Sequence, residues 1–405
     1  MRINPNIRRL ACSLSGKDVD PRGFATPVGL CRCCPPPGKP VVVEYDLHRV
    51  HDELRREAGQ ALPGLWRHAA LLPVIEVPGD YAPDVGGTPS VHHAALGDEL
   101  GLDLFVKNEG GNPSGSFKDR GLAVGVALGA ASGARRFCLP TQGNAGVAAC
   151  LFSRRLGLPA CVVYMPEAWR GSIYHRSCTH FGGEVRFAGA NIAAAGKAMR
   201  ADLAGELTRG EAVDLSTFFE PGRLEGKKTM GLEIVAELGG AALPEYIVYP
   251  TGGGTGLVGI WKAFRELAAM GMLGVAGSPL PRLVAVQSER CAPVVRSFER
   301  GLSEVEPVVS QGTIADGLDV PGAIMGHAIL AAVRESGGTA VAVSDSAIAD
   351  AFARCGMLGI ATSFEGAATL AAVRAMRAGG QLAPGARVLL LLTASQLIPL
   401  SRPAA

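Results

Sequence analysis

Short apolar runs that alternate with segments of helical spacing are the feature of this sequence that most constrains its fold. In a first series, the predicted strands are residues 137–139, 160–165 and 184–188, and the predicted helices are 147–156, 172–181 and 192–207. Strands that are separated by helices pair in parallel, with the helices packed on the sheet. The first series therefore predicts a parallel sheet covered by helices.

A second series repeats the pattern in the rest of the chain. Its predicted strands are 246–249, 283–287, 339–343 and 387–392, and its predicted helices are 257–270, 323–335, 345–354, 365–377 and a stretch within 223–238. We therefore expect an α/β protein with two doubly wound parallel-sheet units and an active-site cleft between them. The expected domains are a short cysteine-containing segment at 1–46, a large domain at 47–121 and 216–405, and a smaller inserted α/β domain at 122–215.

Two glycine-rich turns follow predicted strands. Residues 141–146 read TQGNAG after the strand 137–139, and residues 251–256 read TGGGTG after the strand 246–249. Thr393 follows the last predicted strand in the same way. Ligand sites in open α/β sheets lie at the carboxyl ends of the strands. A glycine-rich turn between strand and helix also leaves backbone N–H groups free to bind a phosphate.

One lysine, Lys118, stands at a predicted transition from loop to helix. It lies in the stretch 107–121, KNEGGNPSGSFKDRG, after several turn-forming residues and before an apolar segment at 122–131. Asp119 suits the first turn of a helix. A solvated surface lysine is the ordinary interpretation. A lysine that can react with a carbonyl, together with a phosphate cradle, points instead to pyridoxal phosphate.

Five motifs give the chain a resemblance to threonine synthase, and they occur in the order of that family. They are GGTP at 86–89, GNPSGSFKDRG at 111–121, GNAG at 143–146, EGKKT at 225–229 and PTGGGTGLVGIWKAF at 250–264. The resemblance extends from about residue 71 to residue 397. It implies a pyridoxal-phosphate enzyme of fold type II, similar to the tryptophan synthase β chain, that acts as a carbon–oxygen lyase.

The resemblance also implies roles for individual residues. Lys118 would hold the cofactor as a Schiff base and then move protons at the substrate's α and β carbons, with Phe117 packed near the ring. Asn144 would bind the ring's 3-hydroxyl, and Thr393 would face the pyridine nitrogen. The cofactor's phosphate would be bound by Gly252, Gly253, Gly254, Thr255 and Gly256. The substrate carboxylate would be bound by Thr141, Gln142 and Ala145, together with Asn144.

Structural interpretations stay open beside these roles. Phe117 could be a core side chain, Asn144 a turn residue, and Thr393 a strand-end residue whose hydroxyl is satisfied by the backbone. For EGKKT, Lys227 and Lys228 could bind a substrate phosphate as point charges, or they could belong to a solvated helix start.

The sequence departs from the family beside the cofactor. Relatives usually continue Thr-Gly-Ser-Gly-Leu-Lys where this chain has TASQLI at 393–398, and Gln142 stands where smaller residues are common. The leading hypothesis is a threonine synthase that converts O-phosphohomoserine and water to threonine and phosphate. Because of these departures, the alternative function is β-elimination or β-replacement on serine, threonine, phosphoserine or a related amino acid in a specialised pathway. A non-catalytic ligand-binding homologue is a remote alternative.

Four of the ten cysteines lie near the amino terminus, at Cys12, Cys31, Cys33 and Cys34. Many relatives begin with a zinc ribbon of two CxxC pairs, but here the first pair is reduced to Cys12, with Ser15 at its second position. Adjacent cysteines rarely share a tetrahedral ion well, so we expect a metal-free remnant and no metal site. A site of three thiolates completed by Cys33 is the alternative.

Charge and hydropathy limit the classes of binding partner that the protein is expected to have. The 39 basic and 37 acidic residues nearly cancel, so neither nucleic acid nor an anionic membrane is expected. No apolar stretch reaches the roughly 18 to 20 residues of a membrane span, and the other six cysteines are scattered singly, which suits a reducing compartment. We therefore expect a cytoplasmic protein. The resemblance implies a homodimer and a small-molecule amino-acid substrate, which is phosphorylated if it is O-phosphohomoserine.

Overall fold

The computed structural model describes residues 1–19, 29–56, 62–239, 243–273 and 279–397. Its contacts cluster into two units, the first comprising Met1–Gly87 and Lys118–Thr229 and the second Thr88–Phe117 and Met230–Ala405. These bounds differ from the predicted ones, because residues 47–87 and 216–229 group with the first unit. Whether the predicted division describes separate domains stays a prediction. Within the described ranges, no helix has both the length and the apolar character that crossing a membrane requires.

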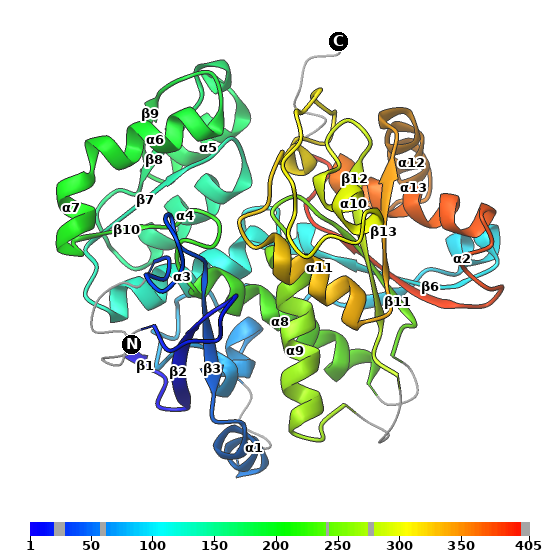
Figure 1. The fold of residues 1–405 in the computed structure, drawn as a ribbon, viewed down its shortest axis with the longest axis horizontal. Coiled ribbons are helices and arrows are strands. Elements are labelled where there is room, and N and C mark those ends of the chain that lie inside the picture. The colour runs from blue at the N-terminus through cyan, green and yellow to red at the C-terminus, as the bar shows by residue number, and fades with distance from the viewer. Residues whose placement is uncertain (20–28, 57–61, 240–242, 274–278, 398–405) are drawn as a thin grey trace. The chain divides into compact units, whose positions relative to one another are not determined.

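The first unit contains a parallel sheet of four strands in the order β10-β7-β8-β9 (Figure 1). The strands are β7 (Arg136–Pro140), β8 (Val162–Met165), β9 (Glu184–Phe187) and β10 (Ala212–Asp214). Helix α3 (Lys118–Ala131) precedes these strands, and the helices between them are α4 (Asn144–Arg155), α5 (Ile173–His180), α6 (Ile192–Asp202) and α7 (Ala204–Arg209). The three predicted strands are confirmed, and β10 is an additional one. The predicted helix 192–207 is two helices, because Leu203 leaves helical geometry with φ −103° and ψ 14°.

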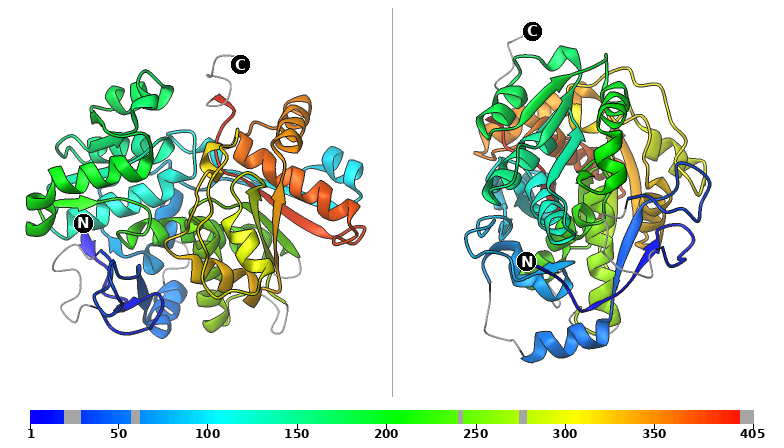
Figure 2. Two further views of the ribbon diagram at one scale, coloured as in Figure 1. Left: turned by 45° about the horizontal axis from the view of Figure 1, so that its top comes forward. Right: turned by 90° about the vertical axis from the view of Figure 1, so that its left-hand side faces the viewer.

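The amino-terminal part of the same unit is built from two short antiparallel pairs (Figure 2). They are β1 (Arg2–Ile3) with β4 (Val74–Ile75), and β2 (Ile7–Cys12) with β3 (Val41–Tyr45). Helix α1 (Leu47–Arg56) follows β3.

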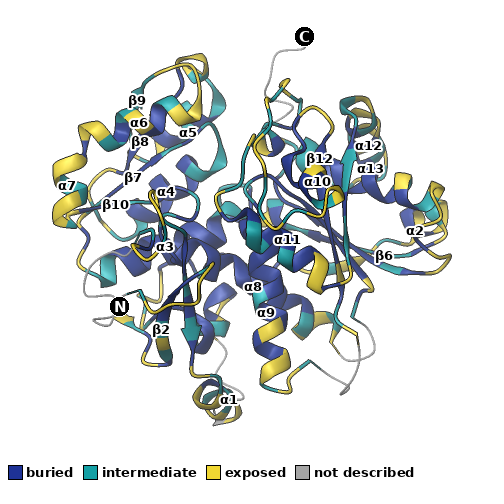
Figure 3. Cartoon of the chain, in the orientation of Figure 1, coloured by how far each residue is buried: buried dark blue, intermediate teal, exposed yellow. Residues whose placement is uncertain are grey.

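The second unit contains a sheet of six strands in the order β13-β12-β11-β14-β6-β5, parallel except for β5. The strands are β5 (Ser90–His92), β6 (Asp103–Asn108), β11 (Tyr246–Pro250), β12 (Arg282–Ser288), β13 (Thr339–Val343) and β14 (Arg387–Leu392). The central strands β11 and β14 are buried almost throughout (Figure 3). Because Tyr246 pairs with Val388 in this parallel register, the two strands end side by side.

Helices pack on this sheet as the alternation predicts. They are α2 (Ala94–Leu100), α9 (Thr255–Ala269), α10 (Pro293–Glu299), α11 (Gly326–Glu335), α12 (Asp345–Met357) and α13 (Phe364–Ala378). Helix α13 contacts β11, β12, β13 and β14 and supplies much of the apolar core. Helix α8 (Gly222–Leu238) begins in the first unit and ends in the second. The sequence pattern did not predict α2, α10, β5 or β6.

Strand β6 was not predicted because its apolar run is short and ends at Lys107. The Lys107 side chain is nevertheless fully buried. The ammonium group lies 3.0 Å from a Glu233 carboxylate oxygen and 3.3 Å from one of Glu237, and it also donates to the carbonyl oxygen of Thr88. A buried cation of this kind persists only because it is paired. The pair ties β6 to the second half of α8.

Replacing Lys107 with methionine should therefore cost about 3–5 kcal/mol, since it removes the cation that compensates the buried Glu233 carboxylate. Denaturant unfolding would measure this loss. In the double variant that also carries Glu233→Gln, much of the loss should be recovered, because no buried charge then lacks its counterion. Losses in the two single variants that simply add in the double variant would contradict this account.

Candidate active site

The glycine-rich loop at 251–256 connects β11 to helix α9, as predicted. Gly254 precedes the helix with a φ of 76°, a left-handed conformation that glycine adopts without a steric penalty. Among the residues that the structure describes, no acceptor receives the backbone N–H groups of Gly252, Gly253 or Gly254. These amides lie at the positive end of a helix dipole, which is the arrangement that binds phosphate groups. The loop therefore fits the phosphate of a cofactor.

The loop is held rigidly around these amides. Thr251 donates its N–H to the carbonyl of Val286 at 2.7 Å and accepts from the Gln287 side chain at 3.0 Å. A Cβ atom on Gly252 would lie 2.2 Å from the carbonyl oxygen of Gly317. The close approach requires glycine and presents the amides in a fixed geometry before any ligand binds.

Thr393 ends the neighbouring strand β14 and is 4% exposed. Its carbonyl oxygen accepts the N–H of Phe117 at 3.0 Å, and Ser116 forms an antiparallel bridge with Ala394. The Phe117 ring meets the Tyr249 ring edge to face, with centroids 6.2 Å apart. Phe117 and Thr393 are thus joined directly, and the ring contact with Tyr249 connects them to β11, the strand that precedes the glycine loop.

Tyr249 is a residue that the sequence analysis missed. It is 2% exposed, and no hydrogen-bond partner for its hydroxyl is found in the described part of the chain. A Cβ atom on Gly256 would lie 1.9 Å from this hydroxyl. Burial, with a smaller contribution from Glu109, raises the pKa of Tyr249 well above its usual value, so the hydroxyl stays protonated.

Lys118 is the residue that follows Phe117, and it begins helix α3, as predicted. Helix α8 approaches α3 closely, because a Cβ atom on Gly226 would lie 2.0 Å from the carbonyl oxygen of Arg120. The Lys227 side chain crosses α3 one turn after Lys118, with its Cε 3.3 Å from where a Cβ of Gly121 would be. Glycine at these two positions therefore brings a second amine into the neighbourhood of Lys118.

The interpretation of EGKKT as a solvated helix start is wrong, because Glu225, Lys227 and Lys228 are all fully buried. The two lysines also do not act as a pair. Lys228 lies 2.7 Å from the Glu225 carboxylate and 4.2 Å from the centroid of the Tyr45 ring, and Tyr45 donates to the same carboxylate at 3.1 Å. Lys228 is therefore committed to a structural contact. Burial, followed by the charges of Lys118 and Arg223, lowers the pKa of Lys227 well below its usual value.

Glu220 is a further buried charge that the sequence analysis missed. One carboxylate oxygen accepts the N–H of Arg223 at 2.9 Å, and the other has no hydrogen-bond partner among the described residues. A Cβ atom on Gly125 would lie 3.0 Å from the first oxygen. Burial raises the pKa of Glu220 to about 7, against the opposing effects of Arg223, Gly222 and Lys227.

This raised pKa predicts a pH-dependent stability. Between about pH 4.5 and about pH 7, Glu220 ionises in the unfolded chain while it stays protonated in the folded chain, so the free energy of unfolding falls as the pH rises. The full loss is on the order of 3 kcal/mol. Glu220→Gln lacks this titration. Denaturant unfolding at about pH 4.5 and at about pH 7 measures the effect. As the pH rises, the free energy of unfolding of the variant should increase by this amount relative to that of the wild type. An unchanged difference between the two proteins at both pH values would contradict the raised pKa of Glu220.

The loop at 141–146 is the predicted carboxylate-binding loop, and it lies between β7 and α4 in the first unit. The Thr141 hydroxyl accepts the N–H groups of Gly143 and Gly146, at 3.1 and 3.3 Å, and fixes the loop. The backbone N–H groups of Gln142, Asn144 and Ala145 find no acceptor within the described residues. The three residues are half-buried. They offer a carboxylate a set of amides at the start of a helix.

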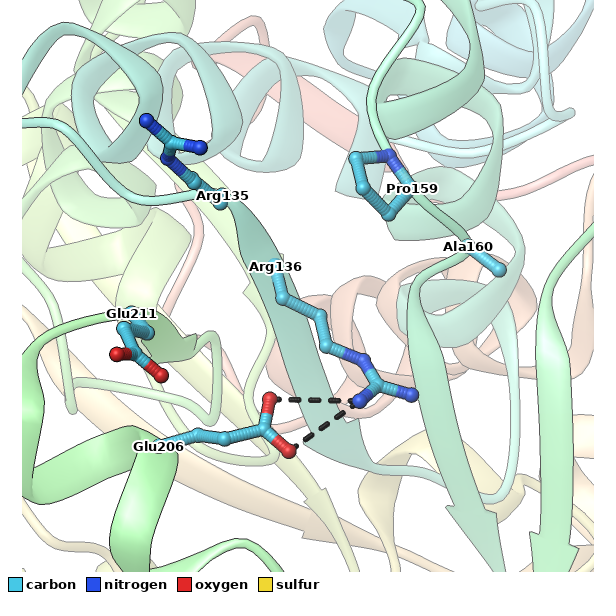
Figure 4. A pocket seen from close by; sticks show the side chains of 6 residues that line it. All are labelled: Arg135, Arg136, Pro159, Ala160, Glu206 and Glu211. Carbon is cyan, nitrogen blue, oxygen red and sulfur yellow. Dashed lines mark hydrogen bonds and ion pairs between the residues drawn. The ribbon is translucent and has the colours of Figure 1, made fainter.

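A surface pocket of about 320 Å³ in the first unit lies elsewhere. Its lining includes Arg135, Arg136, Glu206 and Glu211, at the amino end of β7 (Figure 4). The loop at 141–146 follows the carboxyl end of that strand. Arg136 already pairs with Glu206 at 3.2 Å. Because ligand sites in such sheets lie at the carboxyl ends of strands, we do not assign the active site to this pocket.

Three comparisons with known proteins agree with this geometry. The family model described as pyridoxal-phosphate dependent enzyme matches residues 81–394. The chain is 32% identical to a threonine synthase of Methanosarcina acetivorans over 76% of this chain and 72% of that protein. It is 30% identical to a threonine synthase of Methanocaldococcus jannaschii over 79% of this chain and 76% of that protein.

Solved structures share the fold. Maize serine racemase matches with a TM-score of 0.65 at 21% identity, over 78% of this chain and 91% of that one. The processed form of threonine deaminase isoform 2 from Solanum lycopersicum matches with a TM-score of 0.64 at 20% identity, over 77% of this chain and 85% of that one. These similarities confirm the predicted α/β fold.

Proposed function

This chain belongs to the pyridoxal-phosphate-dependent enzymes and, within them, to the threonine synthase family, and we propose that it converts O-phosphohomoserine and water to threonine and phosphate. The observation that carries the proposal is the set of backbone amides at Gly252–Gly254 that find no acceptor among the described residues, beside Thr393 and its bond to Phe117. Lys118 is the next residue in the chain. The second unit thus supports a phosphate site, and Lys118, whose amine would react with the cofactor, directly follows Phe117 in the chain.

Lys118 would hold the cofactor covalently, and Gly252–Gly256 would bind its phosphate. When bound, pyridoxal phosphate supplies an electron-withdrawing ring that stabilises negative charge on the substrate's carbons. Thr393 would place a neutral hydroxyl, and not a carboxylate, against the ring nitrogen. This favours elimination and replacement over transamination.

The surroundings of Lys118 suit an amine that accepts and returns protons. An amine must lose its own proton before it can act as nucleophile or base. Coulomb repulsion between Lys118 and Lys227 is mutual, and Lys227 is fully buried. Lys118 could therefore take a proton from the substrate's α carbon and deliver it to a neighbouring carbon.

The first unit offers groups for both ends of the substrate. The amides of Gln142, Asn144 and Ala145 would bind the carboxylate, in line with the role that the resemblance implies. Lys227 is a buried amine near Lys118 that a phosphate dianion would hold in its charged form. This supports a phosphorylated amino acid as the substrate. The homodimer stays a prediction.

A β-elimination on serine or threonine is the second candidate. Ala394 is 4% exposed and Gln396 is half-buried, so side chains occupy positions where the family has glycine. Such crowding would reduce the space beside the ring and favour a smaller substrate.

Separate assays distinguish the two reactions. Purified protein loaded with pyridoxal phosphate should release equal amounts of phosphate and threonine from O-phosphohomoserine. Release of ammonia and a keto acid from serine or threonine, without phosphate release from O-phosphohomoserine, would favour the second candidate. Loaded protein that forms none of these products would overturn both.

A further inference from the structure

We propose that the amino-terminal segment binds one zinc ion through Cys12, Cys31, Cys33 and Cys34. Their four sulfur atoms lie within 4.8 Å of one another, and all are free thiols. A tetrahedral zinc ion with Zn–S bonds of about 2.3 Å holds its sulfurs about 3.8 Å apart. The Cys12 and Cys34 sulfurs are already 3.6 Å apart. Small side-chain movements would complete the tetrahedron.

Two tight turns present the first thiols. The turn after β2 closes with the N–H of Cys12 bonded to the carbonyl of Lys17 at 2.9 Å, and Ser15 donates its N–H to the Cys12 sulfur at 3.5 Å. In the second turn the N–H of Cys31 bonds to the carbonyl of Lys39 at 2.8 Å, and Lys39 donates its N–H to the Cys31 sulfur at 3.3 Å. Each turn thus aims a backbone donor at a sulfur, which stabilises the thiolate that a metal requires.

The second turn is built for this approach. Gly38 has a φ of 90°, and a Cβ atom there would lie 2.1 Å from the carbonyl oxygen of Cys31. Cys12 and Cys31 are 2% and 3% exposed. The two turns therefore bury two of the four ligands.

Adjacent cysteines rarely share a tetrahedral ion well, but here the sulfurs of both Cys33 and Cys34 belong to the cluster. The Ser15 hydroxyl oxygen lies 3.6 Å from the Cys33 sulfur. Cys33 therefore fills the corner that a cysteine at position 15 would supply in a paired CxxC site. Cys33 and Cys34 are the exposed and half-buried members of the cluster, which leaves an entry path for the ion.

The charges nearby suit four thiolates, which leave a zinc site with a net charge of about −2. Arg32 lies between two of the ligands in the sequence, and Lys17 and Lys39 belong to the two turns. The ion would cross-link these turns across the β2–β3 hairpin. That hairpin carries Tyr45, which bonds to Glu225 on α8. The site would thus be structural and would support the helix that carries Lys227.

The test is the metal content of the full chain, purified without chelators, and the visible spectrum after cobalt(II) replaces the metal. We expect one zinc per chain and the intense absorption bands of a four-thiolate cobalt site. Cys33→Ala should weaken these bands, and adding Ser15→Cys to this variant should restore them. Cys291→Ala and Cys355→Ala, which remove buried cysteines elsewhere, should leave zinc content and spectrum unchanged. Chelation should lower the thermal midpoint of the wild type.

Several results would overturn the proposal. One is a reduced wild-type protein that retains no zinc after reconstitution and dialysis. A second is an unchanged cobalt spectrum in Cys33→Ala, which would remove Cys33 from the ligand set. A third is a native disulfide between Cys12 and Cys34. Because Cys33 is exposed, its alanine variant should fold and keep circular dichroism like that of the wild type.

Discussion

Replacing Lys118 with alanine should lower kcat for threonine formation by at least about a thousandfold, since general acid–base catalysis alone contributes a factor of this order. The variant should also lose the visible absorption of the enzyme-bound cofactor, because no amine remains at this position to hold it covalently. Phosphate release from O-phosphohomoserine and an absorption spectrum of the same preparation measure both effects.

Lys197→Ala is the matched control, because Lys197 is an exposed lysine of α6 in the same unit. It should retain wild-type activity and colour. A Lys118→Ala protein that keeps a tenth or more of the wild-type kcat would remove Lys118 from the chemistry, whatever the cofactor content of the preparation.

Gly254→Ala should weaken the binding of pyridoxal phosphate at least tenfold. The new Cβ would lie 2.1 Å from the Ile329 side chain, and alanine at a φ of 76° costs about 1–2 kcal/mol. The clash and the strained backbone would displace the loop amides in the variant, whereas binding the phosphate requires the original amide positions. Cofactor titration monitored by absorbance gives the dissociation constant.

Gly271→Ala separates the two contributions. Gly271 follows the other end of α9 with a φ of 68°, and nothing lies within 4 Å of a Cβ there. This variant should lose about 1–2 kcal/mol of stability and keep its cofactor affinity. Equal affinities in Gly254→Ala and wild type would show that this loop does not bind the phosphate.

The strand ends and the glycine loop could be predicted because their signals are local. The apolar run of β11 is followed at once by Thr251 and three glycines, and the run of β14 is followed by Thr393. Parallel strands place such residues at one edge of a sheet. The order of β11 and β14 as neighbours, however, depends on contacts between segments far apart in the chain.

Buried charged residues could not be predicted from the sequence, because most of their partners are remote in the chain. Lys107 is compensated by Glu233, and Glu225 by Tyr45 as well as by its helical neighbour Lys228. One usable signal was overlooked. Gly121, Gly125 and Gly129 recur at every fourth position of α3, which marks a helix face with close packing.

The cysteine cluster could not be judged from spacing alone. The sequence shows an incomplete CxxC pair, whereas the two turns bring Cys33 to the Ser15 side chain. Which corner a thiol occupies depends on turn geometry, and turn geometry is set by Gly38 and by the backbone bonds around it.

The central claim is that the amine of Lys118 holds pyridoxal phosphate. Borohydride reduction of the cofactor-loaded protein, followed by peptide mass spectrometry, tests it most directly. We predict one pyridoxyl-phosphate adduct per chain, on the peptide that contains Lys118 and on the lysine itself. An adduct on the neighbouring Lys227, or the absence of any adduct at saturating cofactor, would contradict the account.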